Sequence, residues 1–230
     1  WIRLPETLTR ENRVAIRAAD IFATLRFIVT HRSAIGYMTA SGVVMGGLVG
    51  FITSVQQIFF DIFDRADIFP FAFAAIASFM CVGSFGNSRL VERIGARRLS
   101  QGALMAMILL SALHSLVAWA EMESVWSFIA FQALTMLAFA FTGSNFGAIS
   151  MEPFSRGAGM ASSFQAFLTT IVSALLGAFV GSQFNGTTLP LALGFMTYGA
   201  VAMLLVIWAE KGKLFTRPNR GGLRSSNVIQ

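Results

Sequence analysis

The chain has 230 residues, of which 55% are hydrophobic and 12% are charged, and its mean hydropathy is +0.68. This composition excludes a water-soluble globular domain and a disordered chain, because both need more polar residues. Cys81 is the only cysteine, which excludes a scaffold held by intrachain disulfides. The net charge of +6 lies in short segments between apolar runs, without a neighbouring stacking surface, and so does not indicate nucleic-acid binding. We therefore predict a membrane protein.

Six apolar runs, each long enough to cross the hydrocarbon layer as a helix, follow one another along the chain. They cover residues 35–60, 69–90, 99–120, 125–149, 159–183 and 189–209. None of them alternates apolar and polar residues with the period of two that a transmembrane β-barrel requires. The predicted fold class is therefore an all-α membrane protein, in which residues 34–210 form a six-helix bundle.

The basic residues predict the orientation of this bundle. All but one of the 17 Lys and Arg residues fall in alternate loops and in the two terminal segments. The remaining loops contain only Arg65, together with the acidic residues Asp61, Asp64, Asp67, Glu121 and Glu123. Cytoplasmic loops near membrane helices are enriched in Lys and Arg. Residues 1–33 and the basic tail, residues 211–230, are therefore expected in the cytoplasm.

The first 33 residues contain one helical pattern. Apolar residues recur at three- and four-residue steps from Val14 to Ile28, opposite polar residues such as Arg17 and Asp20. This pattern indicates a short amphipathic helix, which lies either on the inner membrane surface or in a solvated linker. Because the chain begins with Trp1 and a segment typical of a loop, we expect it to be a fragment of a longer protein.

Small residues recur at four-residue steps in three of the predicted helices. The glycines in these rows are Gly42, Gly46 and Gly50 in the first helix, Gly143 and Gly147 in the fourth, and Gly177 and Gly181 in the fifth. Such rows let helices approach closely. They fit either static packing or helices that slide against each other, and the first row also fits dimerisation.

No Asp, Glu, Lys or Arg lies near the middle of a predicted span, so the chain lacks an evident proton-coupling residue. The candidates for a wet substrate cavity are the uncharged residues Gln56, Gln57, Gln132, Asn145, Gln165 and Thr169. Their concentration in three spans favours a cavity, whereas each residue taken singly fits a hydrogen bond between helices slightly better.

The sequence contains no phosphate-binding loop, metalloprotease or serine-hydrolase motif, or carboxylate pair placed for acid–base catalysis. His114 is expected to be a structural group near the outer end of the third span, and His31 lies on the opposite side. We therefore expect neither an enzyme nor a bound metal or cofactor.

Three segments carry a resemblance to a known family. Residues 86–98, GNSRLVERIGARR, resemble the acidic-Arg-x-Gly-x-Arg-Arg loop of the major facilitator superfamily, although Ser88 stands where that pattern has its first Gly. Residues 4–8, LPETL, and residues 151–153, MEP, followed by AGMASS at residues 158–163, make the chain similar to the bicyclomycin-resistance (Bcr/CflA) drug-efflux subfamily.

This resemblance implies that the chain is the C-terminal half of a twelve-helix, proton-coupled multidrug antiporter. In such transporters two six-helix halves, each built from two inverted three-helix repeats, rock around a midplane site, with the proton gradient as the energy source. The implied cytoplasmic gate consists of Arg89, Glu92, Arg93, Gly95, Arg97, Arg98 and Glu152. The same arginines equally fit a purely topological role.

The implied surroundings are the bilayer of the bacterial cytoplasmic (inner) membrane, the missing N-terminal half and small amphipathic drugs. The alternative is a six-helix membrane protein that does not transport and acts as an interaction partner or homodimer.

Overall fold

The computed structural model of the protein describes residues 18–154 and 157–216, and every regular element within them is a helix. In chain order the elements are α1 (Ala18–Thr30), α2 (Arg32–Gln57), the π-helical turn η2 (Ile58–Ile62), α3 (Phe69–Ile94), α4 (Ala96–Trp119), α5 (Val125–Met151), α6 (Ala158–Ser182) and α7 (Leu189–Ala209). Six helices, α2 with η2 and α3 to α7, are long and apolar enough to cross a membrane. The all-α fold class is confirmed for the described residues, and a long apolar helix covers nearly all of each predicted span.

The ends of these helices follow local sequence signals. Pro70 and Pro190 stand in the first turns of α3 and α7, where a backbone N–H would have no partner within the helix. Ser124 and Ser127 form a capping box at the start of α5. Gly95 has a φ of 93°, which a side chain would strain, and this residue separates α3 from α4. The two helices therefore run up to Gly95 from both sides, beyond their predicted ends.

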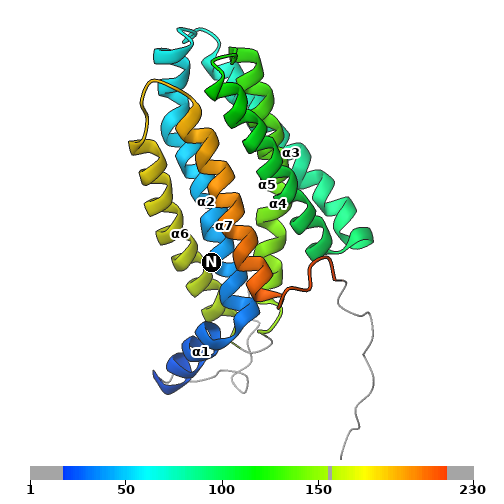
Figure 1. Ribbon diagram of the computed structural model, residues 1–230. Coiled ribbons are helices and arrows are strands. Elements are labelled where there is room, and N and C mark those ends of the chain that lie inside the picture. Colours follow the sequence, from blue (N-terminus) through cyan, green and yellow to red (C-terminus); the bar gives the residue numbers. More distant parts are fainter. Residues whose placement is uncertain (1–17, 155–156, 217–230) are drawn as a thin grey trace, which may run out of the picture.

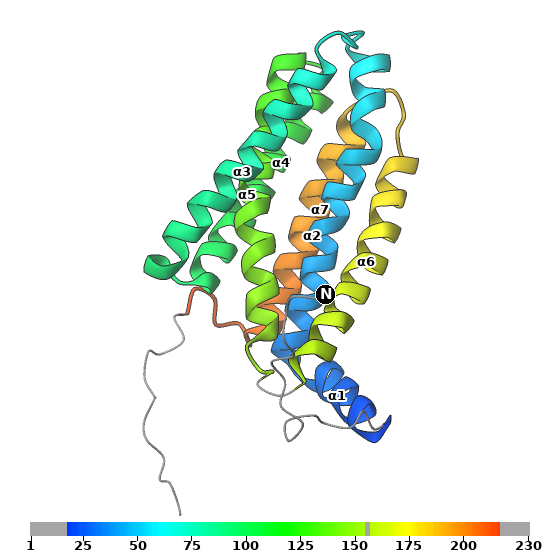
Figure 2. The ribbon, with the colours of Figure 1, turned by 180° about the vertical axis from the view of Figure 1, so that it is seen from behind.

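The central helices of the bundle are α2 and α5 (Figures 1 and 2). Helix α2 packs against α6, α7 and α5, helix α5 packs against α3, α4 and α2, and α4 contacts α7. The helices α2, α3 and α4 form one unit, and α5, α6 and α7 form a second unit in the same order. The contacts of α2 with α6 and α7 correspond to those of α5 with α3 and α4, and corresponding helices run in opposite directions. The bundle is therefore built from two inverted three-helix units, an arrangement that the family resemblance implies.

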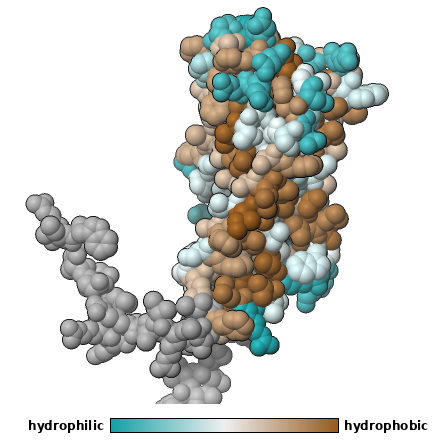
Figure 3. Space-filling view, turned by 90° about the vertical axis from the view of Figure 1, so that its left-hand side faces the viewer, coloured by the Kyte–Doolittle hydropathy of each residue, from teal (hydrophilic) through white to brown (hydrophobic). Residues whose placement is uncertain are grey.

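The connections gather at two opposite ends of the bundle (Figure 1). The basal end comprises α1, the α3–α4 and α5–α6 turns and the segment after α7, and the distal end comprises loops 63–68, 120–124 and 183–188. Within the described ranges, every Lys and Arg except Arg65 lies toward the basal end. Figure 3 shows hydrophilic residues at both ends and a largely hydrophobic middle. The fold thus separates the charges as the loop pattern predicts.

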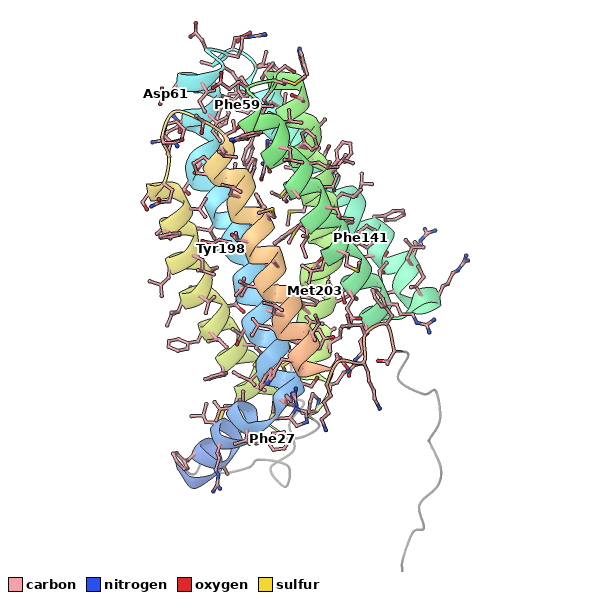
Figure 4. The ribbon with its side chains drawn as sticks, in the orientation of Figure 1. Phe27, Phe59, Asp61, Phe141, Tyr198 and Met203 are labelled. Carbon is pink, nitrogen blue, oxygen red and sulfur yellow. The ribbon has the colours of Figure 1, made fainter. Side chains whose placement is uncertain are left out.

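The predicted amphipathic helix is present as α1, and the residues before 18 lie outside the described part of the chain. Ile28 is fully buried, and the Phe27 ring packs edge-on against Phe154 with centroids 5.6 Å apart. Figure 4 shows Phe27 at the basal end of the molecule. Phe22 is 71% exposed. One side of α1 is therefore docked on the bundle, and its contact with a membrane surface stays a prediction.

Glycines bring α2 and α6 into close contact. A Cβ atom added at Gly46 would lie 2.7 Å from Leu176 Cβ, and one added at Gly177 would lie 2.3 Å from Val49 Cγ1. Both distances are far below the separation of about 3.5–4.0 Å that carbon atoms prefer. Side chains at these two positions would therefore push the helices apart.

The same seam continues through Gly42, Gly50 and Gly181, each of which leaves at most 3.0 Å between an added Cβ and a side chain of the opposite helix. The seam is a packing contact within one chain. The hypothesis that Gly42, Gly46 and Gly50 form a dimerisation surface is therefore wrong, because α6 already covers them.

Replacing Gly177 with Leu should destabilise the bundle by about 1–3 kcal/mol, since this is the typical cost of overpacking a well-packed contact. Gly159 is the matched control in the same helix, because an added Cβ there meets nothing within 4 Å. Thermal unfolding of the purified protein in detergent measures both variants. Equal melting temperatures for Gly177→Leu and Gly159→Leu would show that α2 and α6 are not closely packed.

Candidate functional site

An open cavity of about 220 Å³ lies between α2, α3 and α5. It is lined by Ser41, Met45, Met80, Ser84, Phe139, Ala140, Gly143 and Ser144. Ser41 stands nine positions after the first residue of α2, and Ser144 stands seven positions before the last residue of α5. These offsets place the cavity roughly 10–14 Å along the helix axes from the basal end. The cavity therefore lies inside the apolar part of the bundle.

The lining combines apolar and hydrogen-bonding groups. Three serine hydroxyls can donate and accept hydrogen bonds, while two methionines and one phenyl ring offer adaptable apolar contacts. Gly143 keeps the space open, since an added Cβ would meet only the Phe139 ring of the same helix, at 3.9 Å. Such a cavity suits a small amphipathic ligand. An added Cβ at Gly143 contacts no neighbouring helix, so the predicted role of Gly143 in helix packing stays a prediction.

None of the six predicted cavity residues lines this cavity. Gln56 and Gln57 are exposed at the distal end of α2, next to the π-helical turn. They therefore lie at the opposite end of the bundle from the cavity.

Two of the predicted amides form hydrogen bonds between helices. Asn145 on α5 is buried, and its Nδ2 donates to Oδ1 of Asn87 on α3 at 2.6 Å. Gln165 on α6 accepts a hydrogen bond from Ser150 Oγ on α5 at 2.9 Å. These contacts match the interpretation of the amides as hydrogen bonds between helices, and they connect the central helix α5 with α3 and α6.

Gln132 and Thr169 have buried polar atoms without a hydrogen-bond partner in the protein. Gln132 is completely buried within α5, and both its Oε1 and its Nε2 lack a partner, as does Thr169 Oγ1. A buried polar group left unpaired costs about 1–3 kcal/mol. The role of these residues in a wet cavity stays a prediction, and the enclosed amide of Gln132 allows a direct test.

If Gln132 has no water or ligand partner, the variant Gln132→Leu should unfold at a higher temperature, with a gain of about 1 kcal/mol or more. Gln101 is the matched control, because it is also fully buried but hydrogen-bonds through both amide atoms. Gln101→Leu should lower the melting temperature. A lower melting temperature for Gln132→Leu as well would instead identify Gln132 as a residue that binds internal water.

Arg97 connects several helices at the basal end. Its Nη1 and Nη2 donate to the two carboxylate oxygens of Glu152 at 3.0 and 2.6 Å, and its Nε donates to Glu210 Oε1 at 2.7 Å. The same Glu210 oxygen accepts a hydrogen bond from Tyr37 Oη at 2.9 Å. Bidentate arginine–carboxylate pairs combine strength with defined geometry. One guanidinium thus ties the start of α4 to the ends of α5 and α7, and through Glu210 to α2.

A second group of hydrogen bonds holds the segment that follows α7. Gln101 Nε2 donates to Tyr37 Oη at 3.1 Å, and Gln101 Oε1 accepts from the backbone N–H of Phe215 at 2.6 Å. Arg98 Nε donates to the Phe215 carbonyl at 2.7 Å. Helix α4 therefore anchors the chain beyond α7 to the basal end.

The other residues of the predicted gate have different surroundings. The guanidinium of Arg89 lies 4.9 Å from the centre of the Phe85 ring. Glu92 and Arg93 are exposed in the last turn of α3, and Gly95 forms the turn into α4. The predicted set is thus divided between the network around Arg97 and an exposed helix end, and its function as a gate stays a prediction.

Sequence reasoning missed Glu210, Tyr37 and Gln101. Glu210 could have been found, because it is a carboxylate at the end of a span on the strongly basic side. Tyr37 and Gln101 carry no comparable signal, since their partners are more than 60 positions away in the chain. Their pairing requires the packed bundle.

Replacing Glu210 with Gln should destabilise the protein more than replacing Glu152 with Gln, although Glu152 makes two of the bonds to Arg97. The side chain of Glu210 is 14% exposed and that of Glu152 is 47% exposed. Exposed ion pairs contribute up to about 1 kcal/mol, whereas a charged hydrogen bond shielded from water contributes about 1.5–3 kcal/mol. Melting temperatures in detergent give the order, and a larger loss for Glu152→Gln would contradict this account of the network.

The two histidines have separate partners at opposite ends of the bundle. His31 caps α2, with its Nδ1 accepting from Ala34 N at 3.3 Å, and His114 Nε2 lies 2.5 Å from Glu123 Oε1. Within residues 18–154 and 157–216, no group of three or more His, Cys, Asp or Glu side chains could hold a metal ion.

Comparison with curated proteins supports the motif-based resemblance. The chain is 28% identical over 211 residues to a bicyclomycin resistance protein homolog of Haemophilus influenzae, an alignment that covers 89% of this chain and 50% of that protein. The chain thus spans about half the length of its relative. No family model matches the chain, and no solved structure matches it. The similarity to a curated bicyclomycin resistance protein homolog confirms the resemblance to the bicyclomycin-resistance subfamily that the sequence motifs indicate.

Proposed function

We propose that this chain is the C-terminal half of a proton-coupled exporter of small amphipathic drugs in the bacterial cytoplasmic membrane. The alignment of nearly the whole chain with half of a bicyclomycin resistance protein homolog carries this proposal. In this arrangement the basal end, with its excess of basic residues, faces the cytoplasm. The name of the relative describes a resistance protein and mentions no enzymatic activity.

The cavity between α2, α3 and α5 supplies this half's share of the drug-binding site. Its volume of about 220 Å³ is smaller than a typical drug pocket, which fits a site completed by a second half. Hydroxyl groups at Ser41, Ser84 and Ser144 orient polar groups of the drug, and the methionines adapt to differently shaped apolar parts.

The missing half packs against α3 and α6, the least buried spanning helices. Each carries a row of small residues that are all exposed in this chain: Ala74, Ala77, Cys81, Ser84 and Ser88 on α3, and Ala158, Ser162, Ala166, Thr170, Ala174, Ala178 and Ser182 on α6. Small residues allow close helix contacts within a membrane. The neighbouring row of exposed large residues on α6 suits lipid and consists of Phe167, Ile171, Leu175 and Phe179.

The network around Arg97 makes this half move as one body during transport. It joins the helix ends across both inverted units, so relative motion takes place at the faces of α3 and α6 rather than inside the bundle. Proton coupling then depends on groups outside the spans described here, because their centres carry no charged residue.

Replacing Gly143 with Leu should abolish drug resistance without reducing the amount of protein in the membrane. The leucine would occupy space in the cavity, and its Cβ would meet only the Phe139 ring of the same helix, at 3.9 Å. The test uses the complete protein that contains this chain and measures the growth of a drug-sensitive bacterium in bicyclomycin, with abundance measured by immunoblot.

Gly102→Leu is the control, since Gly102 lies on α4, is exposed, and has nothing within 4 Å of an added Cβ. It should leave resistance unchanged. Full resistance with Gly143→Leu at equal abundance would remove the cavity from the drug pathway.

A further inference from the structure

At the basal end, an arginine of α2 stacks on a tryptophan of α7. The guanidinium carbon of Arg32, the first residue of α2, lies 4.9 Å from the centre of the Trp208 ring, near the end of α7. Figures 1 and 2 show the basal ends of these two helices side by side. Gly36 stands one turn after Arg32 on the same face of α2, and a Cβ added there would lie 3.4 Å from two atoms of the Trp208 ring. The glycine therefore lets the indole lie close to α2, where it supports the guanidinium.

The guanidinium of Arg32 has no anionic partner among the described residues. Its Nε is buried without a hydrogen-bond partner, and none of the ion pairs in the described ranges includes Arg32. Glu210, two positions beyond Trp208, is already bonded to Arg97 and Tyr37. The first turn of α2 contains no acidic residue, although the dipole at a helix N-terminus favours an anion and disfavours a lone arginine. The terminal nitrogens of Arg32 are therefore available to an anion from outside the described chain.

The stacked pair lies on the lipid-facing side of α7. Trp208 is 47% exposed and ends a row of exposed apolar residues that also contains Val201 and Leu204. Steps of three and four residues place this row on one face of the helix. Tryptophans and arginines at the ends of membrane-spanning helices lie at the level of the lipid headgroups. The guanidinium of Arg32 therefore lies where lipid phosphate groups are found.

The charges of the adjoining segments favour an anionic lipid over a zwitterionic one. Arg26 on α1 and Lys211 and Lys213 after α7 are exposed. The backbone N–H of Lys211 donates to the carbonyl of Trp208 at 3.2 Å, so this lysine follows the tryptophan directly in space. Basic residues near the headgroups attract anionic lipids and repel the ammonium group of a zwitterionic lipid.

We propose that Arg32 and Trp208 form a binding site for the phosphate group of an anionic diacyl phospholipid, such as phosphatidylglycerol. The terminal nitrogens of Arg32 donate to two phosphate oxygens, which is the geometry that a guanidinium prefers. The indole holds the plane of the guanidinium, and an acyl chain lies along Leu204 and Val201. The bound lipid thus covers the junction of α2 and α7. The proposal is independent of drug export, since it requires only that the bundle spans a membrane.

Native mass spectrometry of the purified protein in a nonionic detergent tests the site. The wild-type protein should bind phosphatidylglycerol at least about tenfold more tightly than phosphatidylethanolamine. Inorganic phosphate in excess should not displace the bound lipid, because free phosphate lacks the acyl chains. Equal affinities for the two lipids would overturn the proposal, and displacement by inorganic phosphate would identify a site for the free anion instead. Neither measurement depends on the folding of a variant.

Two substitutions locate the lipid on the protein. Arg32→Gln should weaken the binding of phosphatidylglycerol at least about tenfold, because it removes the charged hydrogen bonds to the phosphate. Trp208→Leu should weaken binding to a smaller extent, since the charge remains while its support is lost.

Each substitution has a matched control. Arg89→Gln removes the same charge from the exposed surface of α3 at the basal end, and Trp119→Leu removes an exposed tryptophan at the distal end of α4. Both controls should bind phosphatidylglycerol as the wild-type protein does. Unchanged affinity in Arg32→Gln, or an equal loss in Arg89→Gln, would show that the net charge of the basal end attracts the lipid and would refute the site.

Discussion

Every backbone N–H and C=O group that enters the hydrocarbon layer must find its partner within the protein, and the architecture of this chain depends on that constraint. It restricts the apolar runs to helices and confines each irregular segment to one of the two ends of the bundle. The special backbone conformations are found there as well: the glycine turn at Gly95 and the left-handed residues Asp64 and Glu121 all lie outside the helices. Within the spans, hydrogen bonds between helices therefore depend on polar side chains.

Because lipid is as apolar as leucine, the hydrophobic effect contributes little to holding such helices together, and close packing and hydrogen bonds must replace it. The chain uses both. Glycines let α2 and α6 meet at backbone distance, whereas α3 and α5 are joined by a buried amide pair, Asn87 with Asn145. These two contacts occupy equivalent places in the inverted units but differ in chemistry. The repeat therefore preserves the arrangement of the helices and not the interactions that hold it.

Charged groups act at the two ends, where helices must be joined without lipid contact. At the basal end, Arg97 lies between two carboxylates from different helices, which gives a fixed connection across both units. At the distal end, Glu123 contacts His114 of α4 and accepts a hydrogen bond from Thr188 at the start of α7, which connects loop 120–124 to both helices.

The sequence alone determined the all-α fold, the presence of six long apolar helices and the distribution of basic residues between the two ends, because helix length and hydropathy are local properties. It also identified Arg97 and Glu152 through a family motif, and the structure joins them directly. Only the tertiary structure decided which polar residues meet. Gln132 is enclosed without a partner, Glu210 completes the arginine network, and the cavity is lined by serines and methionines rather than by the expected amides. The physical reason is that the direction of a side chain within a bundle depends on which helices flank it, and that information is absent from the composition and spacing of a single span.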